Sequence, residues 1–221
     1  MESLDMLANN VANTGTAGFK ADREFYGLFE NRLPMIERQW TDFSQGTLTL
    51  TGNPLHVALD GPGFLAVNSP GGTVYTRAGD LRISKANQLE TSASGFPLRD
   101  ALVNGRPITV DPLQPIDIDR DGTVRQGGEQ IGKIEIANVN QGAGIGKLGN
   151  SYFVMASPNQ GASPTGDVEV RQGMLEQSNV AASDAAVRLI GVMRQFEMLQ
   201  RAALLGADMN RHAIEEVARV S

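Results

Sequence analysis

The sequence predicts a mainly β protein with helical ends, in which a glycine-rich β domain is inserted between a short N-terminal helix and a long C-terminal helix that pair with each other. Three observations predict this. Apolar residues recur at helical spacing over residues 180–221, alternate between about Gly46 and Gln172, and return to helical spacing over residues 2–12. The predicted organisation is an N-terminal helix and turn at 1–20, a connector at 21–45, the β domain at 46–172 and a C-terminal coiled-coil helix at 173–221.

The predicted C-terminal helix has more apolar surface than one partner helix can cover. With Leu189 as the first position of a heptad, the a and d positions are mostly apolar, which predicts a seam for a partner helix. These positions are Leu189, Val192, Phe196, Leu199, Ala203, Gly206, Asn210, Ala213, Val217 and Val220. Neighbours such as Ile190 and Met193 widen the apolar surface beyond that seam. Forty residues form a rod of about 60 Å, which exceeds a compact domain, so we expect part of the helix to contact other chains.

The N-terminal helix carries a matching stripe, so the two chain ends are expected to pair. Residues 9–20, rich in asparagine, threonine and glycine, are typical of a helix end followed by turns. Residues 21–45 are poorly periodic and are expected to form a partly extended connector. The predicted assembly interface consists of Leu4, Leu7, Val11, Leu189, Val192, Phe196, Leu199 and Ala203.

The middle of the chain shows the two-residue period of β-strands. Apolar residues alternate in four short runs, and glycine pairs or Asn-Gly and Asp-Gly steps supply turns between them. The runs are Leu55, Val57 and Leu59; Ile116 and Ile118; Ile134 and Ile136; and Val168 and Val170. Many short strands joined by tight turns are therefore expected.

Composition and charge exclude several classes of protein. The 221 residues carry a formal net charge of -6 without a basic cluster, which argues against nucleic-acid binding. The absence of cysteine excludes disulfide and thiolate chemistry. Charges at Arg194, Glu197 and Arg201 interrupt the most apolar stretch, so no transmembrane segment is expected. Residues 1–5 show neither the basic nor the apolar region of a secretory signal peptide.

Two loops imitate ligand-binding motifs without completing them. Residues 117–122 place acids and a glycine as in the first half of a calcium loop, but Gly128 occupies the position of the required glutamate. A hairpin turn between strands at 115–119 and 123–126 is therefore the favoured interpretation. Residues 144–149 match GxGxxG, yet a strand rather than a helix is expected next, so we interpret them as a flexible glycine turn.

No catalytic, cofactor-binding or metal-binding residues are predicted. The chain has two histidines, and a Ser/His/Asp triad would need one of them. His56 lies between Leu55 and Val57 and is expected to face solvent, while His212 lies near the chain end. We therefore expect a non-enzymatic protein without a cofactor.

Three motifs in a fixed order carry a family resemblance. Residues 7–20 contain N-N-V-A-N and T-A-G-F-K, residues 51–79 contain TGNPLHVALDGPGFLAV followed by YTRAG, and residues 173–180 read GMLEQSNV. Together they resemble the bacterial flagellar rod, hook and filament axial family, over nearly the whole chain. Within it, the length and the stretch Arg194–Met198 are most similar to proximal-rod subunits.

The resemblance implies a structural subunit of the flagellar basal-body rod. It implies terminal helices that pack with other rod proteins and possibly with further copies of the chain, and export by the flagellar type III apparatus without a cleaved signal peptide into the periplasmic part of the basal body. Two departures stand out. Family members usually have about ten more residues before the equivalent of Met1, or nearly three helical turns, so Met1 is either an internal methionine or the start of a truncated subunit. Residues 211–221 match the family weakly.

Two alternatives stay open. One is a distal-rod or hook-type subunit of the same family. The other is a β-domain binding module, such as an adhesin with a helical stalk, because a fold by itself does not fix a function.

Overall fold

The computed structural model describes residues 2–27, 35–137, 145–149, 151–155 and 168–220. The chain divides into a helical unit, Met1–Ala12 with Ala181–Ser221, and a β unit, Asn13–Val180. Each unit is described by itself. The finer division predicted from the sequence, with limits at residues 20, 45 and 172, stays a prediction.

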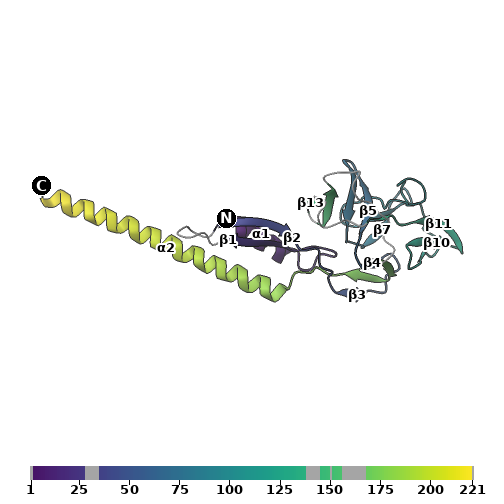
Figure 1. The fold of residues 1–221 in the computed structure, drawn as a ribbon, viewed down its shortest axis with the longest axis horizontal. Helices are drawn as coiled ribbons and strands as arrows, with labels where there is room; N and C mark the ends of the chain where they lie inside the picture. The colour runs from purple at the N-terminus through teal and green to yellow at the C-terminus, as the bar shows by residue number, and fades with distance from the viewer. Residues whose placement is uncertain (1, 28–34, 138–144, 150, 156–167, 221) are drawn as a thin grey trace. The chain divides into compact units, whose positions relative to one another are not determined.

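The helical unit consists of α1 (Glu2–Ala12) and α2 (Ala182–Val220), the long helix that ends at the C-terminus in Figure 1. The two helices pack against each other, and Leu7 of α1 and Ala185 of α2 are buried. Asp184 lies in the first turn of α2, where a negative charge is favourable beside the unpaired backbone N–H groups. These helices confirm the prediction of a short and a long helix that pair.

The β unit is built around a five-stranded antiparallel sheet, of which Figure 1 labels β5 and β13. Its order is β12 (Ile136–Ala137), β5 (Phe64–Ser69), β6 (Gly72–Thr76), β14 (Tyr152–Met155) and β13 (Ile145–Gly149). The central β5 and β6 form a hairpin in which Ser69 lies opposite Gly72. Short strands of this kind explain why apolar residues recur in brief runs between glycines.

Smaller antiparallel groups complete the β unit. The pairs are β1 (Asp22–Gly27) with β2 (Met35–Thr41), β3 (Leu48–Leu50) with β16 (Met174–Glu176), β4 (Val57–Asp60) with β15 (Glu169–Gln172), and β7 (Leu81–Ile83) with β8 (Leu89–Thr91). A three-stranded group follows the order β11 (Glu129–Lys133), β10 (Thr123–Gln126) and β9 (Asp117–Ile118). The two strands nearest the end of the β unit, β15 and β16, thus pair with strands from its beginning.

The main apolar core lies among these small sheets. It is formed by side chains of residues between 57 and 170, and the buried Tyr152 hydroxyl donates to Thr91 Oγ1 at 2.8 Å within it. Its largest fully buried members are Leu59, Leu65, Leu89, Leu98, Ile108 and Ile134. A second cluster joins Phe43, Phe64 and Phe153, whose rings meet edge to face at centroid distances of 5.3–5.8 Å.

One local prediction was wrong, and the structure adds contacts to two others. The segment 145–149 is the edge strand β13, paired with β14, rather than a flexible glycine turn. The described part of the connector at 21–45 contains a regular antiparallel pair, in which Asp22 lies opposite Thr41. The partly exposed His56 places its Nδ1 2.9 Å from Thr51 Oγ1. In each case a partner distant in the chain or a side chain in the turn provides contacts that local spacing does not encode.

Candidate functional site: the junction of the chain ends of the β unit

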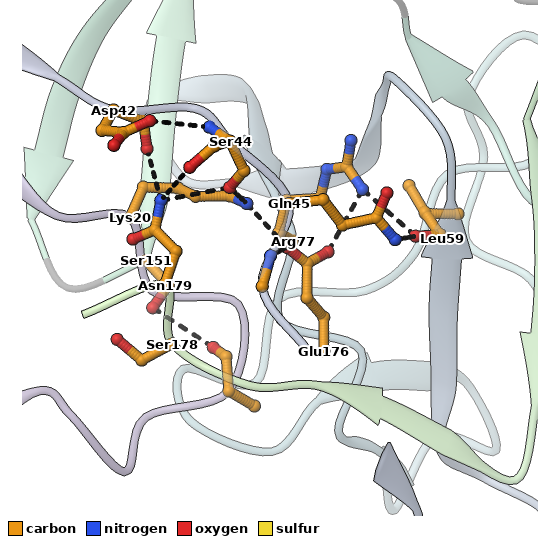
Figure 2. A network of polar contacts seen from close by, with 12 residues as sticks. Lys20, Asp42, Ser44, Gln45, Leu59, Arg77, Ser151, Glu176, Ser178 and Asn179 are labelled. Atoms are coloured by element: carbon orange, nitrogen blue, oxygen red, sulfur yellow. Dashed lines mark hydrogen bonds and ion pairs between the residues drawn. The ribbon is translucent and has the colours of Figure 1, made fainter. Parts of the chain in front are cut away.

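Four chain segments far apart in the sequence meet at one place in the β unit (Figure 2). We call this place the junction. It comprises Gly18–Ala21, Asp42–Gly46, Arg77 and Glu176–Asn179. Gly18–Lys20 of the first segment, Arg77 and the whole fourth segment fall within the three motifs that carry the family resemblance.

The carboxylate of Glu176 lies at the centre of the junction, between two cations. Its Oε1 accepts a hydrogen bond from Lys20 Nζ at 2.6 Å, and its Oε2 accepts one from Arg77 Nη1 at 3.1 Å. Oε1 also accepts from the backbone N–H of Gly46 at 2.9 Å. The side chains of Lys20 and Glu176 are fully buried, and that of Arg77 is almost so. A buried carboxylate with this many donors is held in a single position.

The two cations have further partners in the backbone. Lys20 Nζ also donates to the carbonyl oxygen of Ser44 at 2.6 Å. Arg77 donates to the carbonyl oxygens of Leu59 at 3.2 Å and Gly61 at 2.7 Å, and its guanidinium lies 5.3 Å from the centre of the Phe64 ring. Burial lowers the pKa of both Lys20 and Arg77, and the Glu176 carboxylate opposes this effect.

The side chain of Asn179 connects the backbones of the entering and leaving segments. Its Oδ1 accepts from the N–H of Ala21 at 2.7 Å, and its Nδ2 donates to the carbonyl oxygens of Asp42 at 2.8 Å and Ser44 at 3.1 Å. The carboxamide has an acceptor and two donors, so this one side chain can hydrogen-bond to a backbone N–H of one segment and to backbone carbonyl oxygens of another. Neither aspartate nor leucine offers this combination.

Close backbone approach explains the glycine of the T-A-G-F-K motif. Gly18 donates its N–H to the carbonyl oxygen of Glu176 at 2.8 Å and has a φ of 65°. A Cβ at this position would collide with the backbone of Arg77 and Ala78. Only glycine meets both the steric and the conformational requirement.

The following residue, Phe19, links the junction to the edge of the five-stranded sheet. Its side chain is fully buried, and Lys147 Nζ of β13 lies 4.1 Å from the ring centre. The same ammonium donates to the carbonyl oxygen of Lys20 at 3.1 Å and to Asp22 Oδ2 at 2.7 Å. The motif residues of 16–20 therefore contact the sheet as well as the returning chain.

The predicted assembly residues lie in the helical unit, outside the junction. Leu7 is buried, whereas Leu4, Val11, Leu189 and Val192 are half-buried. Farther along α2 the seam is open: Phe196 is 43% exposed, Leu199 is 69% exposed, and Ala203 is exposed. The first part of the predicted seam is thus partly covered within the unit, and the later part is exposed.

The aspartate-rich turn at 117–122 is the predicted hairpin turn. Strands β9 and β10 pair with Ile118 opposite Val124, and Gly122 donates its N–H to the carbonyl oxygen of Asp119 at 2.9 Å. The carboxylates already have cationic partners, since Asp119 Oδ2 lies 2.7 Å from Arg125 Nε and Asp121 Oδ2 lies 2.9 Å from Lys133 Nζ. Among the described residues, no group of three or more acidic or histidine side chains is arranged to hold a metal ion.

We expect Asp121→Asn to lower the stability of the β unit slightly at pH 7 and by less at pH 3. Hydrogen bonds from Lys133 and Thr123 lower the pKa of Asp121 from 3.8 to about 2. A carboxyl with a depressed pKa in the folded state contributes stability above pH 3.8, and this contribution is lost as the pH falls towards 2. Because the side chain is 59% exposed, solvent screening limits the effect to about 1 kcal/mol. Urea unfolding of both proteins at pH 7 and pH 3 measures it, and an unchanged difference between the two pH values contradicts it.

The helices of the described chain include none with an apolar run long enough to cross a bilayer.

The sequence did not predict that Lys20, Arg77 and Glu176 form one cluster, although each of these residues lies in one of the three family motifs. The available signal was a charged residue within each of three short motifs otherwise rich in small, apolar and amide residues. Spacing could not reveal their contact, because 156 residues separate Lys20 from Glu176.

Comparisons with known proteins agree with the position of these motifs. Residues 58–126 match the family model described as the flagellar hook protein FlgE/F/G D1 domain, and residues 171–211 match the model described as the flagellar basal body rod FlgEFG protein C-terminal region. The first match covers Arg77, and the second covers Glu176 and Asn179.

Whole-chain relatives point to the same family. The chain is 31% identical to the flagellar basal-body rod protein FlgF of Caulobacter vibrioides, over 99% of this chain and 93% of that protein. It is 34% identical to the FlgF protein of Mesorhizobium japonicum, over 88% and 83% of the two chains. The flagellar basal-body rod protein FlgG of Caulobacter vibrioides is 28% identical over 89% of this chain and 86% of its own length. The chain belongs to the flagellar basal-body rod protein family.

Proposed function

We propose that this protein is a FlgF-type structural subunit of the bacterial flagellar basal-body rod and assembles through its helical unit. The relatives with the highest identity cited above carry the name FlgF, and family membership supports a place in the basal body. The proposed role is structural rather than enzymatic. It involves neither a cofactor nor nucleic acid.

The observation that carries this proposal is the apolar surface of α2 left uncovered within the helical unit. An exposed apolar patch of this extent is typical of a surface that binds other proteins. Its exposed large side chains are Val187, Ile190, Met193, Phe196, Met198, Leu199, Leu204, Leu205 and Met209. Because they surround the helix instead of forming one narrow stripe, we propose that several neighbouring rod subunits cover them.

The proposed interface comprises the residues predicted from the sequence. Leu4, Leu7 and Val11 of α1 and Leu189 and Val192 of α2 form the part in which the chain ends pair. Phe196, Leu199 and Ala203 extend the same seam towards other rod proteins or further copies of the chain. We also propose that the chain reaches the periplasmic part of the basal body through the flagellar type III apparatus, without a cleaved signal peptide.

Deletion of the gene, followed by electron microscopy of isolated basal bodies, tests this function. We expect the deletion strain to be non-motile, with basal bodies that lack a completed rod, and expression of the full chain to restore both. Normal basal bodies in the deletion strain would contradict the proposal.

The relatives named FlgG favour one alternative, a FlgG-type rod subunit. Expression of the chain in two strains of the same organism, one lacking FlgF and the other lacking FlgG, separates the two possibilities. Recovery of motility only in the strain that lacks FlgF supports our assignment, and recovery only in the other strain replaces it.

A further inference from the structure

The junction buries more positive than negative charge. Lys20 and Arg77 are cations with almost no exposed side-chain area, and Glu176 is the carboxylate that contacts both. Asp42 is also nearby, but its Oδ2 lies 2.8 Å from Arg23 Nε, and its Oδ1 accepts from the N–H of Ser44 at 3.0 Å. Glu176 is therefore the carboxylate on which the burial of both cations depends.

The order of these residues in the chain suggests the order in which they can be buried. Lys20 and Arg77 come early, whereas Glu176 follows them by 156 and 99 residues. A chain is synthesised from its N-terminus, so the two cations are present long before their counter-charge. Burying an unpaired charge is strongly unfavourable. Each cation is therefore strongly disfavoured in its final position until Glu176 arrives.

The segment that carries Glu176 also completes the backbone of the β unit. Gln177 donates its N–H to the carbonyl oxygen of Thr47 at 2.9 Å, and β16 pairs with β3. The N–H of Gly18 donates to the carbonyl oxygen of Glu176, and the N–H of Ala21 donates to Oδ1 of Asn179. By contrast, most of the main apolar core is formed by residues between 57 and 154. The junction thus adds mainly polar and backbone contacts to a core that is largely built without it.

We propose that Glu176 is an electrostatic latch, whose carboxylate permits Lys20 and Arg77 to be buried and so closes the two ends of the β unit as the last step of its folding. Before closure, the segments 16–21 and 173–180 are open while the core strands are formed. The latch thus joins residues 173–180, which precede α2 in the chain, to residues 16–21, which follow α1. This inference rests on the fold alone and does not depend on the proposed function.

Hydrogen exchange of the full-length protein carrying Glu176→Gln tests the latch. Glutamine has nearly the same shape but no charge, so the variant leaves two buried cations without a counter-ion. We expect the amides of Gly18, Ala21 and Gln177 to exchange about a hundredfold faster than in the parent protein. Two core amides serve as a reference: the N–H of Leu89 donates to the carbonyl oxygen of Ile108, and the N–H of Leu98 donates to that of Leu89. Their exchange rates should change much less.

Lys20→Met separates charge balance from simple packing. It alters the shape of the side chain more than Glu176→Gln does, yet it leaves one cation, Arg77, beside one carboxylate. We therefore expect the three junction amides to accelerate by no more than about tenfold, because the remaining ion pair stays balanced. Glu90→Gln is the matched control, since it removes a mostly buried carboxylate from a 2.7 Å pair with Arg82, whose side chain is 55% exposed, and this pair lies outside the junction. It should leave the junction amides unchanged.

The comparison of the two junction variants decides the outcome. Acceleration that is larger for Glu176→Gln than for Lys20→Met supports the latch. A Glu176→Gln protein whose junction amides exchange within twofold of the parent overturns it, as does a Lys20→Met protein that is affected equally or more. If Glu176→Gln yields no folded protein, Lys20→Met decides alone: a folded protein with protected junction amides supports the latch, and an unfolded one overturns it.

Discussion

Replacing Phe196 by aspartate is expected to abolish incorporation of the subunit into the rod while leaving the β unit folded. Phe196 occupies an a position of the predicted seam and is 43% exposed in the helical unit. If a neighbouring subunit covers this ring, the variant would place an unpaired carboxylate in an apolar contact, at a cost of several kcal/mol. That cost corresponds to a loss of affinity of at least about a hundredfold per contact.

Three measurements test this expectation together: swimming motility, the presence of the subunit in isolated basal bodies, and thermal unfolding of the purified protein. Gln195→Asp is the matched control, because it adds the same charge one residue away, about 100° around the helix from Phe196. It should retain motility. Rods that incorporate Phe196→Asp normally would contradict the seam, and equal loss with both variants would show that charge on α2, rather than the seam position, is responsible.

Replacing Gly18 by alanine is expected to destabilise the β unit by more than about 3 kcal/mol, because two effects act together. The φ of 65° is unfavourable for alanine, and its Cβ would collide with the backbone between Arg77 and Ala78. A collision with backbone cannot be relieved by rotating a side chain. The N–H of Gly18 would also be displaced from the carbonyl oxygen of Glu176, which opens the junction.

Urea unfolding of the full chain, followed by tryptophan fluorescence and circular dichroism, measures the effect. Gly15→Ala is the control, since no heavy atom lies within 4 Å of a Cβ built at Gly15. It should change the free energy of unfolding by less than about 0.5 kcal/mol. Equal stability of the two variants would show that the chain near Gly18 can relax and that close approach at the junction is not essential.

Local sequence information was sufficient for the two helices and for the β character of the middle. The stripe of Leu4, Leu7 and Val11 predicted a helix at 2–12, and the structure has α1 at Glu2–Ala12. The repeat from Leu189 onward predicted the long helix found at Ala182–Val220. The hairpin turn at Asp121 and Gly122 was also predicted, because Asp-Gly in a turn has a local physical preference.

Local information was insufficient where a distant partner decides the conformation. The segment of β13 is rich in glycine and suggested a turn, but pairing with β14 makes it a strand. The strand β4 was predicted from alternation, yet Val57, Ala58 and Leu59 are all buried, because other parts of the β unit cover both of its faces. The pairing of β1 with β2 left no periodic signal in the connector.

The sequence by itself determined the elements whose physical cause is local: helical stripes, two-residue alternation, turn chemistry and the family motifs. Only the tertiary structure decided that three of these motifs form one junction, with Glu176 between Lys20 and Arg77. The reason is that the pairing of buried charges depends on distance in space, and a charge can be buried only beside a partner that the fold, rather than the neighbouring sequence, brings into contact.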